Sequence, residues 1–434
     1  MIGKKIYNLA KTLFPINRSI TGDGVRETLR ILKKVNPSLK IKNIDSGTKI
    51  FNWTVPQEWN VKAAWIKDYK NNTIIDFKKN NLHLMSYSEP IDKILSLKEL
   101  KKNLYCMSSR PSAIPYVTSY YKLKWGFCLS KNQLDKLKNG NYKVKIDSSF
   151  KKGSLTYGEI LIPGKSKKEI FLSTYICHPS LANNELSGPC VAIYLSNWIK
   201  SLKNRKYSYR IIFIPETIGS IAYLSKNYKE MKKNIIAGFN LTCLGDNRTY
   251  SFLPSRREDT LSDDVAKHVL KWTHRDYKSY KWIDRGSDER QYCSPGIDLP
   301  VATIMRSKYG EYPEYHSSDD NLKKLVTAEG LDGGYKIIEK AILLIENNYY
   351  PVANYLCEPK LSNFNLYPTD QTNDQSDYPD LTGLKLINFL SYCDGKKSLL
   401  EIAEKCEEPA WALYDISKIL LKNKLIKIKD VKIK

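Results

Sequence analysis

The sequence EIFLSTYICHPSLANNELSG, residues 169–188, joins a strand pattern to a helix pattern through a polar loop. The apolar run from Ile170 to Ile176 is typical of a buried strand in a parallel sheet. Pro179 removes a backbone donor and ends the pairing. Gly188 then opens a stretch with apolar residues at three- and four-residue spacing, which predicts a helix. The loop therefore lies past the carboxyl end of a strand, where open α/β sheets bind ligands.

The same alternation of strand and helix continues towards the C-terminus. Strands are predicted over 209–214, 235–241 and 300–305, and helices from about Gly219, over 263–272 and over 327–346. Repeated βα units of this kind predict a mainly parallel sheet flanked by helices. The fold class is therefore α/β.

Other regions surround this pattern. Residues 1–45 contain two predicted helices and join 151–350 in the α/β domain. Residues 46–150 contain short aromatic and β-branched runs broken by turn residues, which predict a small all-β insertion. Weak periodicity over 351–379 indicates a linker, and three short helices with a terminal strand over 380–434 resemble a winged helix.

The amino-acid composition bears on whether the protein meets a membrane, an oxidising compartment or a nucleic acid. No apolar run approaches the roughly 20 residues that span a bilayer, and no signal-peptide pattern opens the chain. Nine cysteines without paired spacing predict free thiols in a reducing cytoplasm. The net charge of +24 suits an anionic partner, but the lysines are scattered along the chain. A compositional bias is therefore the favoured interpretation over a nucleic-acid site.

The five histidines divide into two groups. His83, His268 and His274 fall in strand or helix patterns that favour packing roles. His178 and His316 instead follow predicted strand ends and stand beside acidic or amide residues. We therefore expect the second group to serve function.

Carboxylates follow the same strand ends. Glu216 comes directly after an apolar strand, where it must be solvated, paired or used in chemistry, and Asp246 ends the next strand similarly. If the strands are neighbours, one edge of the sheet gathers His178, Glu185, Glu216, Asp246 and His316. Histidines with carboxylates in an open cleft suit a catalytic zinc ion with a nearby general base.

Other chemistries are weaker. Cys177 and His178 are adjacent on a predicted extended segment, so their side chains are expected on opposite faces, which excludes a dyad. Ser187 lacks the Gly-x-Ser-x-Gly elbow and is expected to cap a helix. The polar loop 285–292 either binds a polar substrate or is a solvated turn.

Four motifs together resemble a known family. They are CHPSLANNELSG (177–188), IPETIGS (214–220), GSDERQY (286–292) and YPEYHSSDDNL (312–322). In this order they resemble the bacterial aminopeptidase-like proteins with a β insertion and a C-terminal winged helix. Those proteins are distantly similar to the zinc exopeptidases that include aminopeptidase Y and the glutaminyl cyclases. The resemblance implies a zinc-exopeptidase-like fold and placement among polysaccharide-biosynthesis genes, which points to an amide on a sugar.

The exopeptidase pattern implies specific roles. His178 and His316 match histidine ligands, and Glu216 matches the general base. Three acidic ligands are replaced, by Asn184, Thr217 and Thr242. A neutral amide cannot offset the repulsion between two divalent cations, so a two-metal site is not expected. A site for one metal ion stays possible if Glu185, Glu216 or Asp246 takes the place of a missing acidic ligand. A site that binds no metal is the alternative.

Two hypotheses follow. The first is a cytoplasmic single-zinc hydrolase that cleaves an amide of a small polar or sugar-linked substrate, with Glu216 as general base. Its expected metal ligands are His178, Glu185, Asp246 and His316, and its expected substrate-binding residues are Asn184, Asp288, Arg290 and Tyr315. The second is a binding or regulatory protein that keeps the fold without catalysis and uses the winged helix for interactions.

The expected partners are few. We expect a small-molecule amide or peptide substrate and no membrane, and homo-oligomerisation stays open. Nucleic acid is not favoured, because the middle helix of the winged-helix region carries Glu401, Glu404, Glu407 and Glu408, which would repel phosphates.

Overall fold

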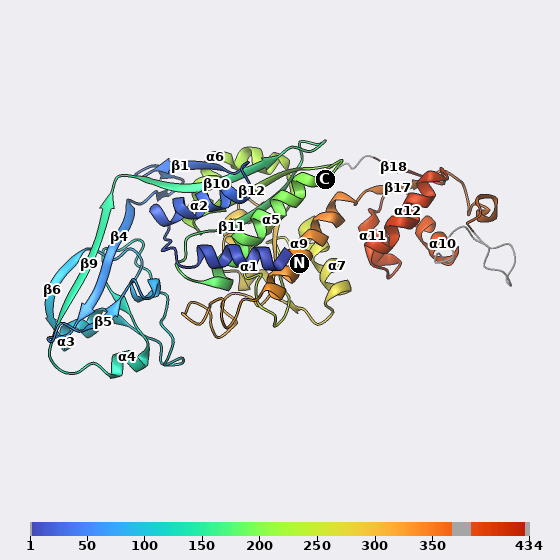
Figure 1. The fold of residues 1–434 in the computed structure, drawn as a ribbon. Coiled ribbons are helices and arrows are strands. Elements are labelled where there is room, and N and C mark those ends of the chain that lie inside the picture. Colours follow the sequence, from blue (N-terminus) through green and yellow to red (C-terminus); the bar gives the residue numbers. More distant parts are fainter. Residues whose placement is uncertain (1, 367–382, 430–434) are drawn as a thin grey trace. The chain divides into compact units, whose positions relative to one another are not determined.

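The computed structural model describes residues 2–366 and 383–429 (Figure 1). The chain forms two compact units. The first unit is built from Met1–Asp263 and Asp276–Ile337, and the second from Asp264–Arg275 and Ile338–Lys434.

An eight-stranded sheet forms the core of the first unit, in the order β1-β10-β12-β11-β13-β16-β14-β15. Its strands are β1 (Lys40–Asp45), β10 (Ser154–Ile162), β11 (Glu169–Tyr175), β12 (Ser208–Ile214), β13 (Ile235–Asn240), β14 (Ser251–Leu253), β15 (Lys278–Ser279) and β16 (Val301–Met305). β12, β11, β13 and β16 are parallel neighbours, whereas β1 pairs antiparallel with β10, β10 with β12, and β14 with β16. The predicted mainly parallel α/β sheet is confirmed.

The central strand β11 is buried along its whole length between β12 and β13. Its continuous apolar run follows from this position, because helices cover both faces of a parallel sheet. On one face, α5 (Ser187–Ser201) packs on β11 and contacts α1 (Ile2–Leu13) and α2 (Asp23–Val35). A Cβ at Gly188 would lie 2.3 Å from the Leu241 carbonyl oxygen, so only glycine permits this close approach.

Further helices follow the other strands. They are α6 (Ile218–Asn234), α7 (Leu261–Thr273), α8 (Glu289–Tyr292) and α9 (Ala328–Glu346). The side chains of Ile218 and Tyr223 on α6 join Phe171 of β11 in one buried apolar cluster. Helices therefore cover the sheet on both sides, as repeated βα units require.

The β insertion contains a separate antiparallel sheet in the order β5-β4-β9-β6. Its strands are β4 (Glu58–Lys67), β5 (Thr73–Asp76), β6 (Ile91–Ser96) and β9 (Asn141–Lys151). Shorter elements in this region are β2 (Lys49–Ile50), β3 (Trp53–Thr54), α3 (Leu97–Leu100), β7 (Leu104–Tyr105), β8 (Phe127–Cys128) and α4 (Lys131–Asp135). The expected all-β insertion is confirmed in type, with two short helices added.

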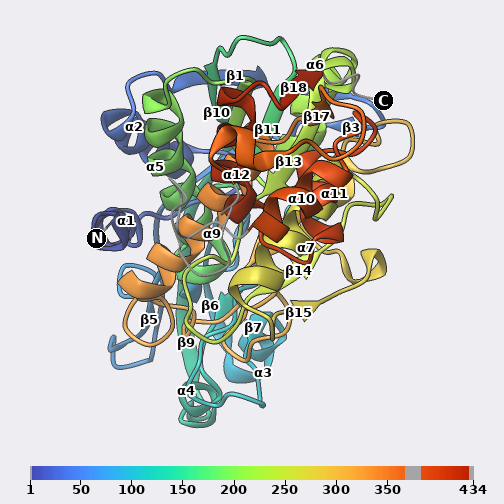
Figure 2. The same cartoon turned by 90° about the vertical axis from the view of Figure 1, so that its right-hand side faces the viewer.

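The second unit contains the winged helix (Figure 2). Its elements are β17 (Tyr350–Ala353), α10 (Gly383–Ser391), α11 (Leu399–Lys405), α12 (Leu413–Lys422) and β18 (Ile426–Lys429). Ser398 and Glu401 form the reciprocal cap that starts α11. β17 extends into the stretch expected to be a linker. That part of the stretch is a strand because it pairs antiparallel with β18. Within 354–366 the chain forms a short 3-10 helix, Leu361–Phe364, and residues 367–379 of the expected linker lie outside the described residues.

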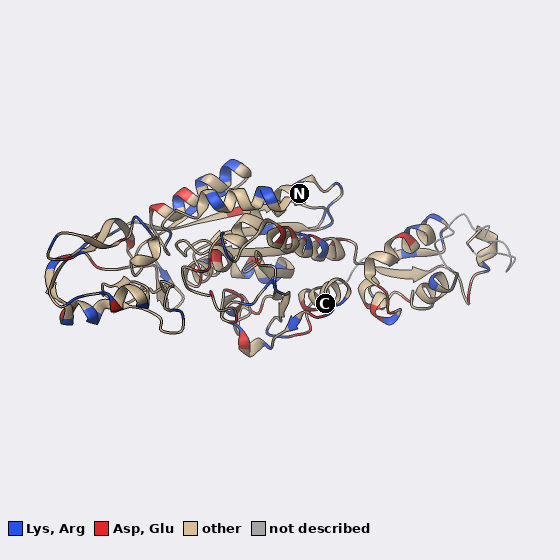
Figure 3. Cartoon of the chain, turned by 60° about the horizontal axis from the view of Figure 1, so that its bottom comes forward, with Lys and Arg blue, Asp and Glu red and all other residues tan. Residues whose placement is uncertain are grey.

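Lys and Arg are spread over the helices, strands and loops of both units (Figure 3). This distribution agrees with the compositional interpretation of the net charge. Among the described residues, no helix combines the length and the apolar character needed to cross a membrane.

Candidate functional site

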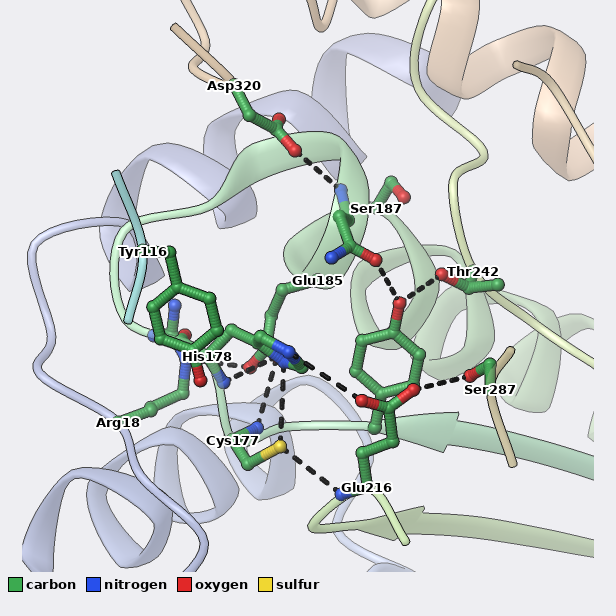
Figure 4. A network of polar contacts seen from close by, with 12 residues as sticks. Arg18, Tyr116, Cys177, His178, Glu185, Ser187, Glu216, Thr242, Ser287 and Asp320 are labelled. Atoms are coloured by element: carbon green, nitrogen blue, oxygen red, sulfur yellow. Dashed lines mark hydrogen bonds and ion pairs between the residues drawn. The ribbon is translucent and has the colours of Figure 1, made fainter. Parts of the chain in front are cut away.

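Polar side chains from several loops meet beyond the carboxyl ends of the parallel strands (Figure 4). Cys177 and His178 follow β11, Glu216 follows β12, and Thr242 follows β13. His316 lies in the loop between β16 and α9. This is the edge of the sheet where ligands bind in α/β proteins.

His178, Glu216 and His316 lie close together at this edge, and this group is called the pocket below. His178 Nε2 lies 3.7 Å from Glu216 Oε2, and the imidazole rings of His178 and His316 have centroids 5.6 Å apart. Burial raises the pKa of Glu216, although the positive charge of His178 opposes the shift. Burial, with a smaller effect of His178, lowers the pKa of His316 to about 3, so its imidazole is neutral at pH 7. The structure therefore brings the two histidines and the carboxylate of Glu216 together, as expected.

Glu185 holds the opposite edge of the His178 ring. Its Oε2 lies 2.8 Å from His178 Nδ1 and also accepts the backbone N–H groups of Cys177 and His178. Burial lowers the pKa of His178, but the Glu185 hydrogen bond and the nearby carboxylates outweigh it, so the net pKa is raised. Glu185 therefore turns His178 Nε2 towards Glu216. Its expected role as a metal ligand stays a prediction.

Arg18, from the loop between α1 and α2, is the partner of Glu185. Its Nε donates to Glu185 Oε1 at 3.0 Å and to the His178 carbonyl oxygen at 3.1 Å. Both side chains of this ion pair are fully buried. The pairing was absent from the sequence-based prediction because Arg18 precedes Glu185 by 167 residues and no local pattern marks it.

The Cys177 thiol lies on the same side as the His178 ring. Its Sγ is 3.5 Å from His178 Nδ1 and accepts the Glu216 backbone N–H. The prediction of opposite faces is wrong here, because β11 ends at Tyr175 and the chain beyond it is not extended strand. Burial raises the pKa of the Cys177 thiol well above its usual value, so it stays protonated and no activated dyad forms.

Asp246 does not face the histidines. Its Oδ2 accepts from Asn183 Nδ2 and the Ser307 N–H, and its Oδ1 accepts from Ser307 Oγ and the Arg248 N–H. Four hydrogen bonds occupy the carboxylate, which joins the loop after β13 to the end of β16. These contacts favour a structural role, and the expected role of Asp246 as a metal ligand stays a prediction.

Neutral residues fill the positions of the missing acidic ligands. Tyr175 donates its hydroxyl to Asn184 Oδ1 at 2.5 Å and pairs with Thr242 Oγ1 at 2.5 Å. All three side chains are buried. None of these three side chains carries a charge that could bridge two cations, and the loss of a two-metal site stays a prediction.

Thr217 carries backbone strain beside the catalytic candidate. It has φ 64 and ψ −75, and the Ile218 N–H donates to the Glu216 carbonyl at 2.8 Å. This is the γ-turn with positive φ, which is rare and unfavourable for a β-branched residue. The turn places Glu216 at the pocket, and strain of this kind clusters at functional sites.

Asp288 supports that turn. Its Oδ1 accepts from the Thr217 N–H at 2.7 Å and from Ser220 Oγ at 2.8 Å, while its buried Oδ2 has no partner among the described residues. Burial and the charge of Glu216 raise the pKa of Asp288 to about 8. Ser287, beside it, donates to Glu216 Oε1 at 2.7 Å. Asp288 thus stabilises the turn that follows Glu216.

Two of the expected substrate-binding residues have visible structural contacts. Tyr315 stacks on the His316 ring at 3.9 Å between centroids, and His316 has φ 52. Arg290 is exposed and donates to Thr217 Oγ1 at 2.6 Å. Asn184 is buried in the neutral network described above. Binding of substrate by these residues stays a prediction.

The β insertion also contributes to the site through Tyr116. Its ring centroid lies 5.0 Å from that of His178 and 5.1 Å from that of His316, and its N–H donates to the His316 carbonyl. Arg110 forms an ion pair with Asp319 in the His316 loop. Sequence patterns indicated only strands in this region and gave no signal that Tyr116 reaches the pocket.

The side chains present fit one metal ion better than two. Among the described residues, Cys177, His178 and Glu185 form the one group of three ligand-capable side chains within 4.8 Å. A neutral thiol and a carboxylate already paired with Arg18 make this group a poor site. His316 Nε2, however, is buried without a hydrogen-bond partner, and Glu185 orients His178 as carboxylates orient zinc-bound histidines. Imidazole nitrogens in their neutral form are zinc ligands, so the His178 and His316 rings, which face one pocket, are suited to a single zinc ion.

Comparisons with known proteins agree with this architecture. The family model described as "Domain of unknown function (DUF4910)" matches residues 7–348, and a winged helix-turn-helix model matches 349–428. A Clostridium acetobutylicum protein named "Putative polysaccharide biosynthesis protein with aminopeptidase-like domain" is 46% identical over 93% of this chain and 91% of its own.

Solved structures show the same relationship. A crystal structure named as a "putative peptidase" from Clostridium acetobutylicum has a TM-score of 0.90 and 42% identity, and covers 99% of this chain and 97% of that one. A zinc aminopeptidase from Bacillus subtilis has a TM-score of 0.57 and 11% identity, over 79% of this chain and 94% of its own. The second likeness is one of fold alone, and it confirms the expected similarity to zinc exopeptidases at that level.

Proposed function

This chain belongs to the DUF4910 family, and we propose that its aminopeptidase-like domain is a hydrolase. The bond that it cleaves would be an amide of a small polar or sugar-linked substrate. The observation that carries this proposal is the 3.7 Å approach of His178 Nε2 to Glu216 Oε2, with the His316 ring beside them. The word polysaccharide in the name of the Clostridium acetobutylicum relative supports a substrate attached to a sugar.

Glu216 is the proposed general base. Its pKa is raised by burial, which brings it closer to neutral pH and strengthens it as a proton acceptor for an attacking water. The Ser287 hydroxyl fixes Oε1, so Oε2 is the oxygen that faces His178 and the pocket. After bond cleavage the same carboxyl group would return its proton to the leaving amine.

His178 and His316 are the proposed ligands of one zinc ion. When bound, the ion would polarise the amide carbonyl and lower the pKa of a bound water. Glu185 bonds to Nδ1 of His178, and the buried Arg18 donates to Glu185 Oε1 and holds that side chain in place. The stacked Tyr315 ring fixes His316.

Metal analysis together with amide hydrolysis tests this proposal. We expect purified protein to carry about one zinc per chain by mass spectrometry of the metal, and the His178→Ala/His316→Ala variant to carry none. N-acetylhexosamines and amino-acid anilides are suitable probes of hydrolysis. Glu216→Gln should keep the zinc and lose at least about 100-fold in rate. Arg248–Glu314 is a partly exposed ion pair of the first unit, so Glu314→Gln is the matched control. Zinc-free folded protein, or an active Glu216→Gln variant, would overturn the proposal.

A binding role without turnover is the second candidate. The neutral network of Tyr175, Asn184 and Thr242 favours it, because it replaces acidic ligands with groups that satisfy one another. In that case wild type and Glu216→Gln would bind the same amide with similar affinity, and neither would release product. Isothermal titration beside the hydrolysis assay separates the two functions.

A further inference from the structure

A cavity of about 330 Å³ lies between the start of α2, with the loop before it, and the base of the β insertion (Figure 1). Its lining residues come from within 16–27, from the first residues of β4 and from the last residues of β9. None of His178, Glu216 and His316 lines it, so it is separate from the pocket. Its volume falls at the lower end of the range found for small-molecule sites.

The two walls of this cavity are joined to each other. The Trp59 N–H donates to Thr21 Oγ1 at 3.0 Å, and the Asp23 N–H donates to Asn60 Oδ1 at 2.8 Å. A Cβ at Gly22 would lie 2.4 Å from the Trp59 carbonyl oxygen, so the backbones meet at a residue that only glycine permits. The cavity is therefore a fixed feature of the fold.

A β-bulge shapes the wall that the insertion contributes. Val61 of β4 pairs with Ser148 of β9. The next pair is Ala63 with Asp147, so Lys62 is an extra residue between them. Bulges redirect side chains and occur often beside functional sites. Here Lys62 and Asp147 both line the cavity.

Several polar groups of the lining lack partners. Ser19 is 2% exposed, and its hydroxyl has no hydrogen-bond partner among the described residues. A buried hydroxyl of this kind is uncommon, and a ligand in the cavity would satisfy it. Other lining side chains make no hydrogen bond or ion pair within the described part of the chain, namely Asn17, Glu27, Lys62, Asp147, Ser149 and Lys151.

We propose that this cavity is a second binding site, which takes a neutral sugar of about one ring. Sugar hydroxyls both donate and accept, so they can pair with the Ser19 hydroxyl and with carboxylate and ammonium groups alike. The C–H face of the ring can pack on the apolar lining residues Ile16 and Val61. Because the lining carries charges of both signs, a charged ligand would also meet a like charge.

Binding of simple sugars tests this site without any need for turnover. Glucose, galactose and N-acetylglucosamine, with glucuronic acid and glucosamine as charged analogues, are titrated into the full-length protein and followed by ligand-detected NMR. We expect at least one neutral sugar to bind with a Kd of about 1 mM or lower. The charged analogues should bind at least about threefold more weakly. Hydrogen exchange with the bound sugar should show protection within residues 16–24 and not within 312–322.

Matched variants locate the binding. Ser149→Trp should block the cavity and abolish binding, and Asn141→Trp, at the exposed start of β9, is its control. Ser19→Ala should weaken binding about three- to tenfold. Its control is Thr28→Val, because Thr28 also has a buried hydroxyl without a partner among the described residues but does not line the cavity. Both controls, and His316→Ala in the pocket, should bind within about twofold of wild type.

Three results would overturn this site. One is that no neutral sugar binds, and another is that the charged analogues bind as tightly or more tightly. The third is that sugar binding survives in Ser149→Trp and Ser19→Ala but is lost in His316→Ala, which would place the sugar in the pocket and leave the proposed function standing. Loss of binding in the cavity variants alone would sustain the site, whether or not the protein carries zinc or hydrolyses an amide.

Discussion

At the scale of single residues, the Arg18–Glu185 ion pair sets the orientation of His178. Both side chains are excluded from water, so removal of one partner leaves an unpaired charge in the interior. Glu185 was foreseen as a residue of the pocket, but not as the group behind His178. That distinction depends on Arg18, which only the folded chain brings near.

Arg18→Gln should lower the free energy of unfolding by about 3–5 kcal/mol. Arg248→Gln is the control, because the Arg248–Glu314 pair is partly exposed and should contribute about 1 kcal/mol or less. Urea unfolding followed by tryptophan fluorescence measures both. Equal losses in the two variants would show that the buried pair does not stabilise the site.

Asp288 should make stability fall as pH rises. Its pKa is about 8 in the folded chain, well above that of an exposed aspartate, so the folded state binds the proton more tightly than the unfolded state. The stabilisation is complete below about pH 4 and is lost as pH rises through about 8. Asp288→Asn keeps an acceptor for Thr217 and Ser220 and removes the titration. Its melting temperature should therefore fall less than that of wild type between pH 5 and pH 8.5; parallel curves would contradict this assignment.

At the scale of elements, the γ-turn at Thr217 joins β12 to α6 and presents Glu216. Thr217→Gly should relieve the positive-φ strain and stabilise the chain by about 1 kcal/mol. Asn204→Gly is the control, because Asn204 also has positive φ but asparagine tolerates it. Thermal unfolding of both variants measures the difference. A Thr217→Gly variant that is no more stable than Asn204→Gly would show that the turn is not strained.

The β insertion is held to the His316 loop by Arg110–Asp319 and by backbone hydrogen bonds between the two segments. The Ser318 N–H donates to the Ile114 carbonyl, and the Tyr116 N–H donates to the His316 carbonyl. Arg110→Gln should therefore increase hydrogen exchange of the Tyr116 and Ser318 amides by several-fold, with β11 amides unchanged as the internal control. Unchanged exchange at Tyr116 and Ser318 would exclude this role for the ion pair.

At the scale of the whole molecule, sequence periodicity predicts the regular elements well. The two helices predicted within residues 1–45 correspond to α1 and α2, and predicted strands lie within about two residues of β11, β12 and β13. Local patterns carry this information because burial on both faces of β11 demands a continuous apolar run. The antiparallel pairing of β10 with β12 was not predicted, since strand direction depends on connections across the whole sheet.

The site was predicted less completely than the fold. His178, Glu216 and His316 follow from their positions after strands, because parallel strands share one carboxyl edge. Asp246 follows the same rule, but Ser307 and Asn183 donate hydrogen bonds to its carboxylate, contacts that no sequence pattern indicates. Tyr116 reaches the pocket from a different sheet, and no pattern within the insertion indicates this.

In the second unit, His268 joins α7 to the winged helix. Its Nε2 accepts the Ala410 N–H at 2.9 Å, and its Nδ1 bonds to Glu404, so the ring is neutral. Burial lowers its pKa, which means that this stabilisation is present above about pH 6.5 and is lost as pH falls further. Hydrogen exchange of the Ala410 amide should rise between pH 7.5 and pH 5.5, after correction for intrinsic rates, and His268→Gln should remove that dependence. An identical pH dependence in the variant would contradict the assignment.

The central claim is that the two imidazoles and Glu216 form one pocket that receives a single metal ion. Anomalous diffraction from crystals of the zinc-soaked protein tests it most directly. The account predicts one zinc peak between His178 Nε2 and His316 Nε2, with Glu216 beside it. No peak at that position, or a peak on Cys177 and Glu185 instead, would contradict it.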